Sequence, residues 1–201
     1  GEVNNIYSSP AKLYLVGDEL VLNKPSIAII GCRDASDYGK RVAFNFAYEL
    51  AKEGFVIVSG LARGIDTYAH LGAVKANGKT IAVLGSGLKH IYPAENKELC
   101  NEIVKKGGAV ITEYEPHIKP LPMNFPSRNR IISGLSNGVL VVEAKQKSGT
   151  LITVDYALEQ GKDVFVIPGN ITSTNSYGTN ELIKQGAKPV TNIQEIIEEI
   201  I

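Results

Sequence analysis

The chain has 201 residues, of which 44% are hydrophobic, and its formal net charge is zero. A chain of this length and composition can bury one sizeable hydrophobic core. Its zero net charge excludes a global electrostatic field that would attract nucleic acid or membranes, so any anion binding must depend on local clusters of charge.

The two cysteines, Cys32 and Cys100, form neither a CxxC pair nor a spacing typical of metal ligands. Isolated cysteines of this kind predict free thiols in a reducing compartment and no metal site. No apolar run approaches the length of a membrane span, and the first residues show no signal-peptide pattern. The sequence therefore predicts a cytoplasmic protein without a membrane partner.

Residues 1–24 are predicted to form an N-terminal extension with short edge strands, in which residues 13–16 begin a hairpin that ends near Leu22. Residues 25–201 are predicted to form one globular unit. Within it, strands are expected at 27–30, 55–58, 81–84, 109–112, 139–142, 164–167 and 188–190. Helices are expected between and after these strands at 38–52, 65–76, 94–106, 128–135, 149–160, 178–185 and 193–201.

The first six of these strands are continuously apolar, which is typical of strands buried on both faces of a parallel sheet. Strands that alternate with helices over short loops indicate an α/β fold with an open, mostly parallel sheet and helices on both faces. Because crossovers are right-handed, the loops from strand to helix gather at the carboxyl edge of the sheet. Ligands of such sheets bind at that edge.

The arginines are concentrated at this predicted edge. Only Arg41 lies away from it, whereas four of the five arginines lie on or beside edge loops: Arg33, Arg63, Arg128 and Arg130. Arg128 and Arg130 also begin a predicted helix, where the helix dipole disfavours cations unless an anion binds. The alternative is that these arginines tie loops together through carboxylates such as Asp34, Asp66, Glu113 and Glu143. With four arginines on one edge, an anion site is the favoured interpretation.

A second positive segment lies where the helix at 149–160 is predicted to begin. Lys145 and Lys147 lead into Ser148 and Gly149, a helix start with backbone N–H groups available to an anion. Glycines follow most strands, and they can either serve the turns themselves or let a phosphate approach the backbone. The chain contains neither GxGxxG nor GxxxxGK[ST], so a dinucleotide or P-loop site is poorly supported.

Catalytic patterns are weak in this sequence. The three histidines are far apart, and no segment resembles a metal-ligand set or a nucleophile elbow. Glu143, at the end of a predicted strand, is the best candidate for a catalytic carboxylate. A role as a tether for Arg128 or Arg130 is nevertheless the favoured interpretation.

Phe125 is the aromatic residue in the loop that leads into the arginine turn. Its ring can stack on a nucleic-acid base or pack as a hydrophobic staple against the helix that follows, and the pattern does not decide between the two. Tyr92 and Tyr114 lie in neighbouring edge loops and could extend such a stacking platform.

Together these segments resemble the DNA-processing protein A family of bacteria, also called DprA or Smf. The resemblance runs from about residue 10 to residue 187 and includes GCRDASDYG, SGLARGIDTYAH, FPSRNRIISGLSNGVLVVEAKQKSGTLITVDYALEQGK and GTNELIKQGA in the same order. It implies an extended Rossmann-like domain that binds single-stranded DNA without sequence preference. It further implies a homodimer that protects incoming DNA in natural transformation and loads the RecA recombinase, with no catalytic activity and no cofactor.

The resemblance also implies which residues bind DNA. The family's motifs fall on four segments of this chain, and the residues expected to grip the DNA backbone are Gly31, Arg33, Ser59, Gly60, Arg63, Gly64, Phe125, Arg128, Asn129, Arg130, Lys147, Ser148 and Gly149. Phe125 is the implied base-stacking ring. Many members carry a helical domain before this unit and a winged-helix domain after it, and neither is expected within these 201 residues.

Two other functions remain as alternatives. The fold also resembles the lysine-decarboxylase-like phosphoribohydrolases, which act on nucleoside monophosphates through a PGGxGTxxE motif. The matching place here is KSGTLIT, which lacks the double glycine and the glutamate, and this argues against hydrolysis. The third possibility is an interaction scaffold whose edge arginines are purely structural.

Overall fold

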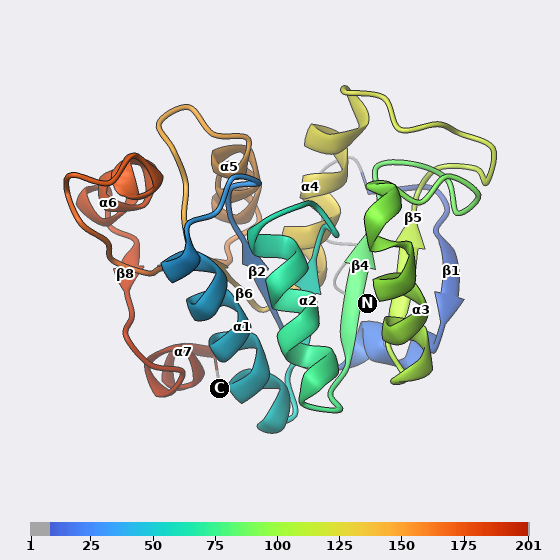
Figure 1. The fold of residues 1–201 in the computed structure, drawn as a ribbon, viewed down its shortest axis with the longest axis horizontal. Helices are drawn as coiled ribbons and strands as arrows, with labels where there is room; N and C mark the ends of the chain where they lie inside the picture. The colour runs from blue at the N-terminus through green and yellow to red at the C-terminus, as the bar shows by residue number, and fades with distance from the viewer. Residues whose placement is uncertain (1–8, 201) are drawn as a thin grey trace.

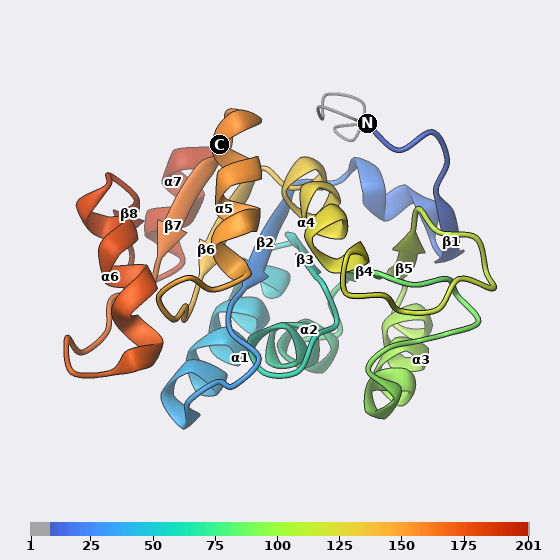
Figure 2. The same cartoon turned by 90° about the horizontal axis from the view of Figure 1, so that it is seen from above.

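The computed structural model describes residues 9–200, which form one eight-stranded sheet with helices on both faces (Figures 1 and 2). The strands are β1 Tyr14–Gly17, β2 Ser26–Ile30, β3 Val56–Ser59, β4 Thr80–Val83, β5 Ala109–Thr112, β6 Gly138–Val141, β7 Asp163–Val166 and β8 Lys188–Pro189. The α-helices are α1 Asp37–Lys52, α2 Ile65–Lys75, α3 Lys97–Lys105, α4 Asn124–Leu135, α5 Thr150–Glu159, α6 Tyr177–Lys184 and α7 Gln194–Ile200.

The sheet runs in the order β1-β5-β4-β3-β2-β6-β7-β8, and every pairing is parallel except that of β1 with β5. The expected open, mostly parallel α/β sheet is therefore confirmed. Six central strands lie within two residues of their predicted positions, which is the usual uncertainty of element ends.

The continuous apolar runs are strands because both of their faces are covered. Alternate residues of β2 point to opposite sides: Ala28 and Ile30 pack with α4 and α5, whereas Ile27 and Ile29 pack with α1 and α2. Figure 2 shows the same two layers, with α1, α2 and α3 on one side of the sheet and α4 and α5 on the other.

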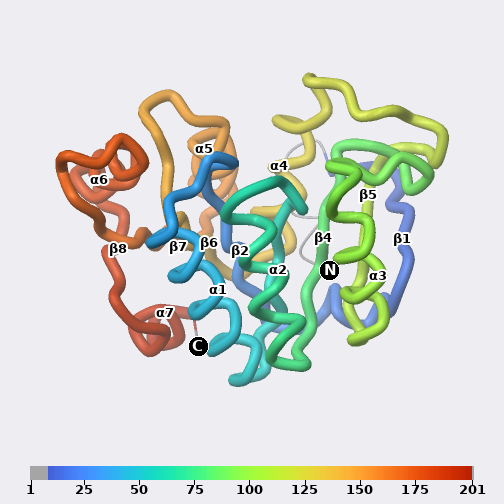
Figure 3. The backbone as a smooth tube through the Cα atoms, in the orientation of Figure 1, coloured from blue at the N-terminus to red at the C-terminus, as the bar shows by residue number. Residues whose placement is uncertain are grey.

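The order of the strands contains one reversal. From β2 the chain continues to β3, β4 and β5 on one side and then returns to place β6 on the other side of β2. The helices α1 and α5, which follow β2 and β6, cover opposite faces. Their first turns therefore diverge at the carboxyl edge, and the crevice that this creates is the general ligand site of open α/β sheets. Figure 3 shows the loops after β2, β3 and β6 gathered at this upper edge.

Two predicted elements differ from the structure. The expected hairpin near Leu22 is wrong: β1 pairs with β5, and residues Glu19–Asn23 form a 3-10 helix, because Asp18 accepts a hydrogen bond from the backbone N–H of Leu20 at its start. The helix expected to begin at Arg128 begins at Asn124 instead. Pro126 lies in its first turn, where a missing N–H costs no helical hydrogen bond.

Residues 1–8 of the expected N-terminal extension and residue 201 of the expected last helix lie outside the described residues. Among the helices at positions 9–200, none has both the length and the apolar character needed to cross a membrane.

Candidate functional site

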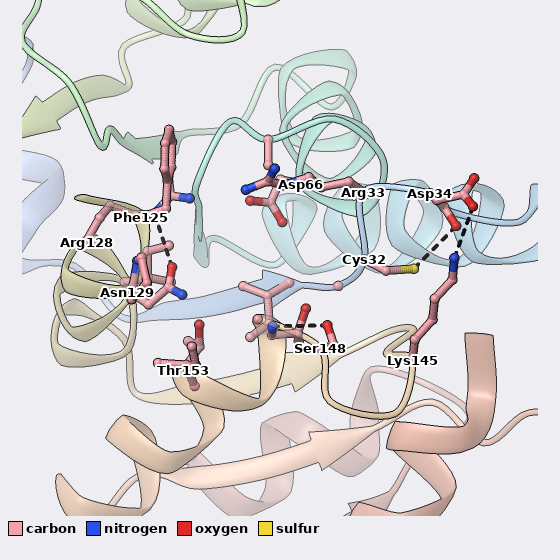
Figure 4. Close-up of a pocket in the computed structure, with 18 of the residues that line it drawn as sticks. Cys32, Arg33, Asp34, Asp66, Phe125, Arg128, Asn129, Lys145, Ser148 and Thr153 are labelled. Carbon is pink, nitrogen blue, oxygen red and sulfur yellow. Dashed lines mark hydrogen bonds and ion pairs between the residues drawn. The ribbon is translucent and has the colours of Figure 1, made fainter. Parts of the chain in front are cut away.

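A cavity of about 410 Å³ opens at the carboxyl edge, where the strand order reverses between β2 and β6 (Figure 4). Three segments far apart in the sequence form its walls: the turn after β2, the start of α4, and the loop that leads from β6 into α5. Its lining comprises residues 30–34, Ala62, Asp66, Pro122, Phe125, Pro126, Arg128, Asn129, Ile132, Lys145, residues 148–150, Ile152 and Thr153.

Arg33 supplies the cavity with an exposed positive charge. It follows β2 directly, and its side chain is solvent-accessible. Its guanidinium lies 5.7 Å from the centre of the Phe125 ring, a cation–π distance. Within residues 9–200, no carboxylate forms an ion pair with Arg33 and no hydrogen bond involves its guanidinium. A planar donor fork in this position is free to bind a phosphate.

Arg128 has a different environment from Arg33, because it is 4% exposed and its donors are used inside the protein. Its Nη1 donates to the carbonyl oxygens of Gly60 and Val83, at 2.6 and 2.7 Å, and its Nε donates to Asn129 Oδ1. The side chain thereby ties α4 to the ends of β3 and β4.

Burial and neighbouring charge act together on Arg128. Burial lowers the pKa of Arg128 to about 10, the charge of Asp66 opposes this shift, and the charge of Arg33 adds to it. Burial raises the pKa of Asp66, and both Arg128 and the backbone N–H of Gly60 oppose that rise. Arg128 remains a cation at neutral pH, so a fixed positive charge lies beneath the cavity.

Phe125 stands at the start of α4 with two cations near its ring. The guanidinium of Arg128 lies 5.3 Å from the centre of the Phe125 ring, and the guanidinium of Arg33 lies 5.7 Å from the same point. Gly85 makes room for this ring, because a Cβ there would lie 2.9 Å from Phe125 Cδ1. The ring lines the cavity in a half-buried position, as stacking on a nucleotide base requires.

The start of α5 forms the wall facing Phe125. Ser148 Oγ accepts a hydrogen bond from the backbone N–H of Thr150, so Ser148 occupies a turn that leads the chain into the helix. Gly149 has an ordinary φ of −59°, and a Cβ placed on it would meet no protein atom within 4 Å. Neither backbone angle nor packing requires glycine at this N-cap, and the absence of a side chain leaves the start of α5 open to close approach.

The structure brings together Gly31, Arg33, Phe125, Arg128, Asn129, Ser148 and Gly149 of the predicted site residues. It places the other six outside the cavity lining, in supporting positions: Ser59, Gly60, Arg63, Gly64, Arg130 and Lys147.

Each supporting position has a local explanation. Ser59 Oγ donates to the carbonyl of Ile29, and Gly64 has a positive φ of 78° and packs against the carbonyl of Arg33. Lys147 also has a positive φ, of 59°. A Cβ on Gly60 would lie 2.7 Å from Arg128 Nη1, so this glycine gives the arginine its place.

The two remaining arginines are paired with carboxylates. Arg130 forms a bidentate ion pair with Glu113, with both N···O distances at 2.7 Å. Arg63 forms an exposed pair with Glu95 at 2.7 Å. The interpretation of edge arginines as ties between loops therefore describes Arg130, whereas Arg33 fits the interpretation as an anion ligand.

Glu143 does not tether an arginine, and that expectation is wrong. Its carboxylate is buried and accepts hydrogen bonds from the backbone N–H and hydroxyl of Ser36 and from the side-chain amide of Asn175. It ties the start of α1 to the loop after β7, and Gly39 leaves the space that the carboxylate fills. The sequence suggested Arg128 or Arg130 as the partner because both lie near Glu143 in the chain. The residues that do bind Glu143, Ser36 and Asn175, lie more than thirty residues away from it.

Sequence reasoning did not assign several lining residues to the site, notably Asp34 and Thr153. Asp34 Oδ2 forms an ion pair with Lys145 Nζ across the mouth at 3.1 Å. Thr150 and Thr153 follow the KSG turn three residues apart, a spacing that places them on one face of α5. That spacing in the sequence could have indicated that both threonines lie on the face of α5 that lines the cavity. No cluster of metal-ligating side chains was found among residues 9–200.

Comparison with known proteins identifies relatives over nearly the whole chain. DNA processing protein DprA of Bacillus subtilis is 45% identical over 199 residues, which cover 98% of this chain and 67% of that protein. Protein Smf of Escherichia coli is 48% identical over 191 residues, which cover 95% of this chain and 51% of that protein. The chain thus spans between about half and two thirds of these relatives.

Solved structures show the same likeness. DNA processing protein A from Streptococcus pneumoniae superposes with a TM-score of 0.94 at 45% identity, covering 100% of this chain and 70% of the other. A structure that describes the single-stranded DNA binding mode of DNA processing protein A from Helicobacter pylori gives a TM-score of 0.90 at 36% identity, covering 98% and 90%. A molybdenum cofactor binding protein from Rippkaea orientalis, at 23% identity and a TM-score of 0.61, shares the fold alone.

The family model described as DNA recombination-mediator protein A matches residues 2–201. With a match over that range and close relatives over nearly its whole length, the chain belongs to the DNA recombination-mediator protein A family.

Proposed function

We propose that the protein binds single-stranded DNA at the cavity between β2, α4 and α5, through its phosphates and without reading its sequence. The observation that carries this proposal is the exposed guanidinium of Arg33 beside the ring of Phe125, facing the open glycine start of α5. The cation suits the phosphate of a nucleotide unit and the π face suits its base, and the glycine lets a ligand approach the start of α5 closely.

The chemistry favours single strands over duplex. A half-buried ring can stack on a base only when that base is unpaired and turned outward. Phe125 offers a π face that any base can use, and Arg33 offers a cation for a phosphate, so neither of these two groups distinguishes one base from another. Affinity should therefore depend little on the sequence of the strand.

The wider role that we propose is the one that the resemblance to the family implies: the protein protects incoming DNA during natural transformation, acts as a homodimer and loads RecA onto the bound strand in the cytoplasm. Residues 25–201 serve as the DNA-binding unit, and residues 1–24 as its extension. The proposal assigns no catalytic residue and no cofactor. No feature of the cavity favours hydrolysis of a nucleoside monophosphate.

The test is fluorescence anisotropy with labelled oligo-dT, oligo-dA and a duplex of equal length. Wild-type protein should bind both single strands with similar affinity and the duplex more weakly. Arg33→Ala should weaken binding to both single strands by roughly the 1.5–3 kcal/mol of a charged hydrogen bond. Arg41→Ala is the matched control, because Arg41 is an exposed arginine on α1 and not part of the cavity lining.

Two results would contradict the proposal. One is a wild-type protein that binds neither oligonucleotide at low salt. The other is Arg33→Ala binding as tightly as Arg41→Ala. Incubation with AMP in the same buffer, followed by product analysis, tests the hydrolase alternative directly.

A further inference from the structure

A pair of side chains outside the cavity has the same chemistry as the cavity itself. The guanidinium of Arg63, in the turn after β3, lies 5.8 Å from the ring centre of Tyr92, in the loop after β4. The Tyr92 ring is in turn 5.7 Å from the Phe125 ring, centre to centre. Cations and rings thus form a continuous row, Arg33–Phe125–Tyr92–Arg63, that leads from the cavity across the carboxyl edge.

The outer part of this row is accessible to solvent. Tyr92 is 36% exposed, and the side chain of Arg63 is 52% exposed. Neither residue lines the cavity. A tyrosine ring and a guanidinium plane are both surfaces on which bases stack, and the guanidinium can also bind a phosphate.

The two loops that carry this pair are fixed to each other. The side-chain amide of Asn96 donates to the carbonyl of Leu61 at 2.8 Å and to Thr67 Oγ1 at 2.9 Å. The imidazole of His70 accepts from the backbone N–H of Leu61. The Asn96–Leu61 bond joins the turn after β3 to the segment that follows Tyr92, and the bond from Leu61 to His70 of α2 fixes that turn, so the backbone that carries the pair is held before any ligand arrives.

The charge of Arg63 is engaged only weakly. Its partner is Glu95, whose side chain is 58% exposed, and exposed ion pairs contribute little net stability. A phosphate oxygen can therefore replace the Glu95 carboxylate at little cost. The arrangement also implies that Glu95 competes with DNA for Arg63.

The angle between the rings indicates what kind of strand fits. The planes of Tyr92 and Phe125 are inclined by 55°, so bases stacked on the two rings cannot belong to one continuous base stack. The row therefore suits a single strand whose neighbouring bases are splayed apart.

We infer that Tyr92 and Arg63 form a second nucleotide subsite, which takes the nucleotide adjacent to the one stacked on Phe125. This inference rests on the proposed binding of single-stranded DNA in the cavity and extends it by one base and one phosphate. The subsite acts only on strands long enough to leave the cavity.

The experiment compares two lengths of thymidylate: the mononucleotide dTMP as the short strand, which can fill the cavity but not the adjacent subsite, and oligo-dT of about twelve nucleotides as the long strand, within the range that single-stranded DNA sites cover. Tyr92→Leu keeps the apolar volume but removes the π face. It should weaken binding of the long strand by roughly 5- to 100-fold, the effect of losing one base–aromatic stack, and change binding of the short strand less than about twofold. Tyr92→Phe should bind both lengths as the wild type does.

Tyr48→Leu is the matched control, because Tyr48 also carries a cation over its ring, Lys52 at 5.5 Å, but lies near the far end of α1. It should bind both lengths normally. Arg33→Ala should lose affinity for both lengths, which separates the cavity from the subsite. Glu95→Gln should bind the long strand more tightly by a few-fold.

A second measurement needs no variant. Long oligo-dT carrying 5-iodouracil, irradiated on wild-type protein, should cross-link to Tyr92 as well as to Phe125. Cross-linking at Phe125 alone, together with wild-type affinity of Tyr92→Leu for the long strand, would overturn the subsite and leave the proposed function intact. Absence of binding to either length by the wild type would overturn both.

Discussion

At the scale of single residues, the edge arginines belong to two kinds that share one sequence pattern. Arg128 and Arg130 are held by carbonyl and carboxylate oxygens of the protein, whereas Arg33 contacts only a ring. The two kinds carry the same charge. They differ in how many of the guanidinium N–H donors are already used in hydrogen bonds inside the fold.

Because of this difference, substitutions of Arg128 and Arg33 should change the free energy of unfolding by very different amounts. Arg128→Met should lower the free energy of unfolding by about 3–5 kcal/mol, because it leaves Asp66 and the carbonyls of Gly60 and Val83 without their buried partner. Arg33→Ala should change it by less than about 0.5 kcal/mol. Urea denaturation followed by circular dichroism measures both. Equal stabilities of the two variants would contradict the assignment of Arg128 as a buried anchor.

Gly149 provides a second prediction at this scale. Gly149→Ala should change the free energy of unfolding by less than about 1 kcal/mol, because its φ of −59° suits any residue and its Cβ meets open space. It should nevertheless weaken binding of oligo-dT, since the added methyl group stands where a phosphate approaches.

Gly161→Ala is the control for Gly149→Ala. Gly161 also has open space around it, but its φ is +72°, so alanine there is strained. This variant should lose stability and keep its affinity for DNA. If Gly149→Ala binds oligo-dT as the wild type does, the start of α5 is not a ligand surface.

At the scale of elements, the turn after β3 is stabilised by a buried histidine. His70 Nε2 accepts from the backbone N–H of Leu61, whose φ is +61°, and His70 Nδ1 lies 2.8 Å from the Thr80 hydroxyl. Thr80 donates onward to the carbonyl of Ile57, so the neutral tautomer with a proton on Nδ1 satisfies the whole chain of hydrogen bonds. A protonated ring would leave Leu61 N–H without an acceptor.

This network makes stability depend on pH. Burial, aided by the charge of Arg128, lowers the pKa of His70 from 6.5 to about 3. In the unfolded chain the imidazole takes up a proton below about pH 6.5, whereas in the folded protein it stays neutral. The contribution of neutral His70 to the free energy of unfolding is therefore complete above pH 6.5. It is lost as the pH falls toward 3, by up to about 1.4 kcal/mol per pH unit.

Urea denaturation at several values between pH 7 and pH 5 measures this slope in the wild type and in His70→Gln. The variant should be less stable at pH 7 and less sensitive to pH. A wild-type slope no steeper than that of His70→Gln would contradict the neutral, buried state of His70.

The elements themselves were largely predictable from sequence, and the reasons are local. Continuous apolar runs at β2, β3 and β6 indicated strands buried on both faces. The residues that pack against these strands on either face of the sheet confirm this prediction. The start of α4 was predicted too late because Pro126 was assigned to the preceding loop, although proline fits a first helical turn. The strand β1 was predicted, but its antiparallel pairing was missed because its partner β5 lies almost a hundred residues away, beyond any local pattern.

At the scale of the whole molecule, the site exists because the strand order reverses. More than ninety residues separate Arg33 from Phe125 in the sequence. The segments that carry Arg33, Phe125 and Gly149 nevertheless meet where α1 and α5 diverge. Sequence reasoning could place all three on one edge, since parallel strands share it. It could not decide which side chains face the cavity, because Arg63 and Arg130 differ from Arg33 only in having carboxylates nearby in space.

The same architecture explains how a chain of zero net charge can bind an anion. The acidic residues Glu95 and Glu113 neutralise two of the edge arginines and Asp66 offsets Arg128, whereas Arg33 has no ion pair within residues 9–200 and keeps its positive charge at the cavity. Binding should therefore depend on few phosphate contacts, and its salt dependence should be moderate.

The most direct test of DNA binding at this cavity is the affinity for oligo-dT across a salt series, for wild type, Arg33→Ala and Arg41→Ala. Each phosphate contact to a single strand contributes a slope of about −0.7 in log K against log salt. The wild type and Arg41→Ala should share one negative slope, and Arg33→Ala should bind more weakly with a slope shallower by about that amount. A wild-type affinity independent of salt, or the same slope in Arg33→Ala and Arg41→Ala, would contradict binding of the DNA backbone at this cavity.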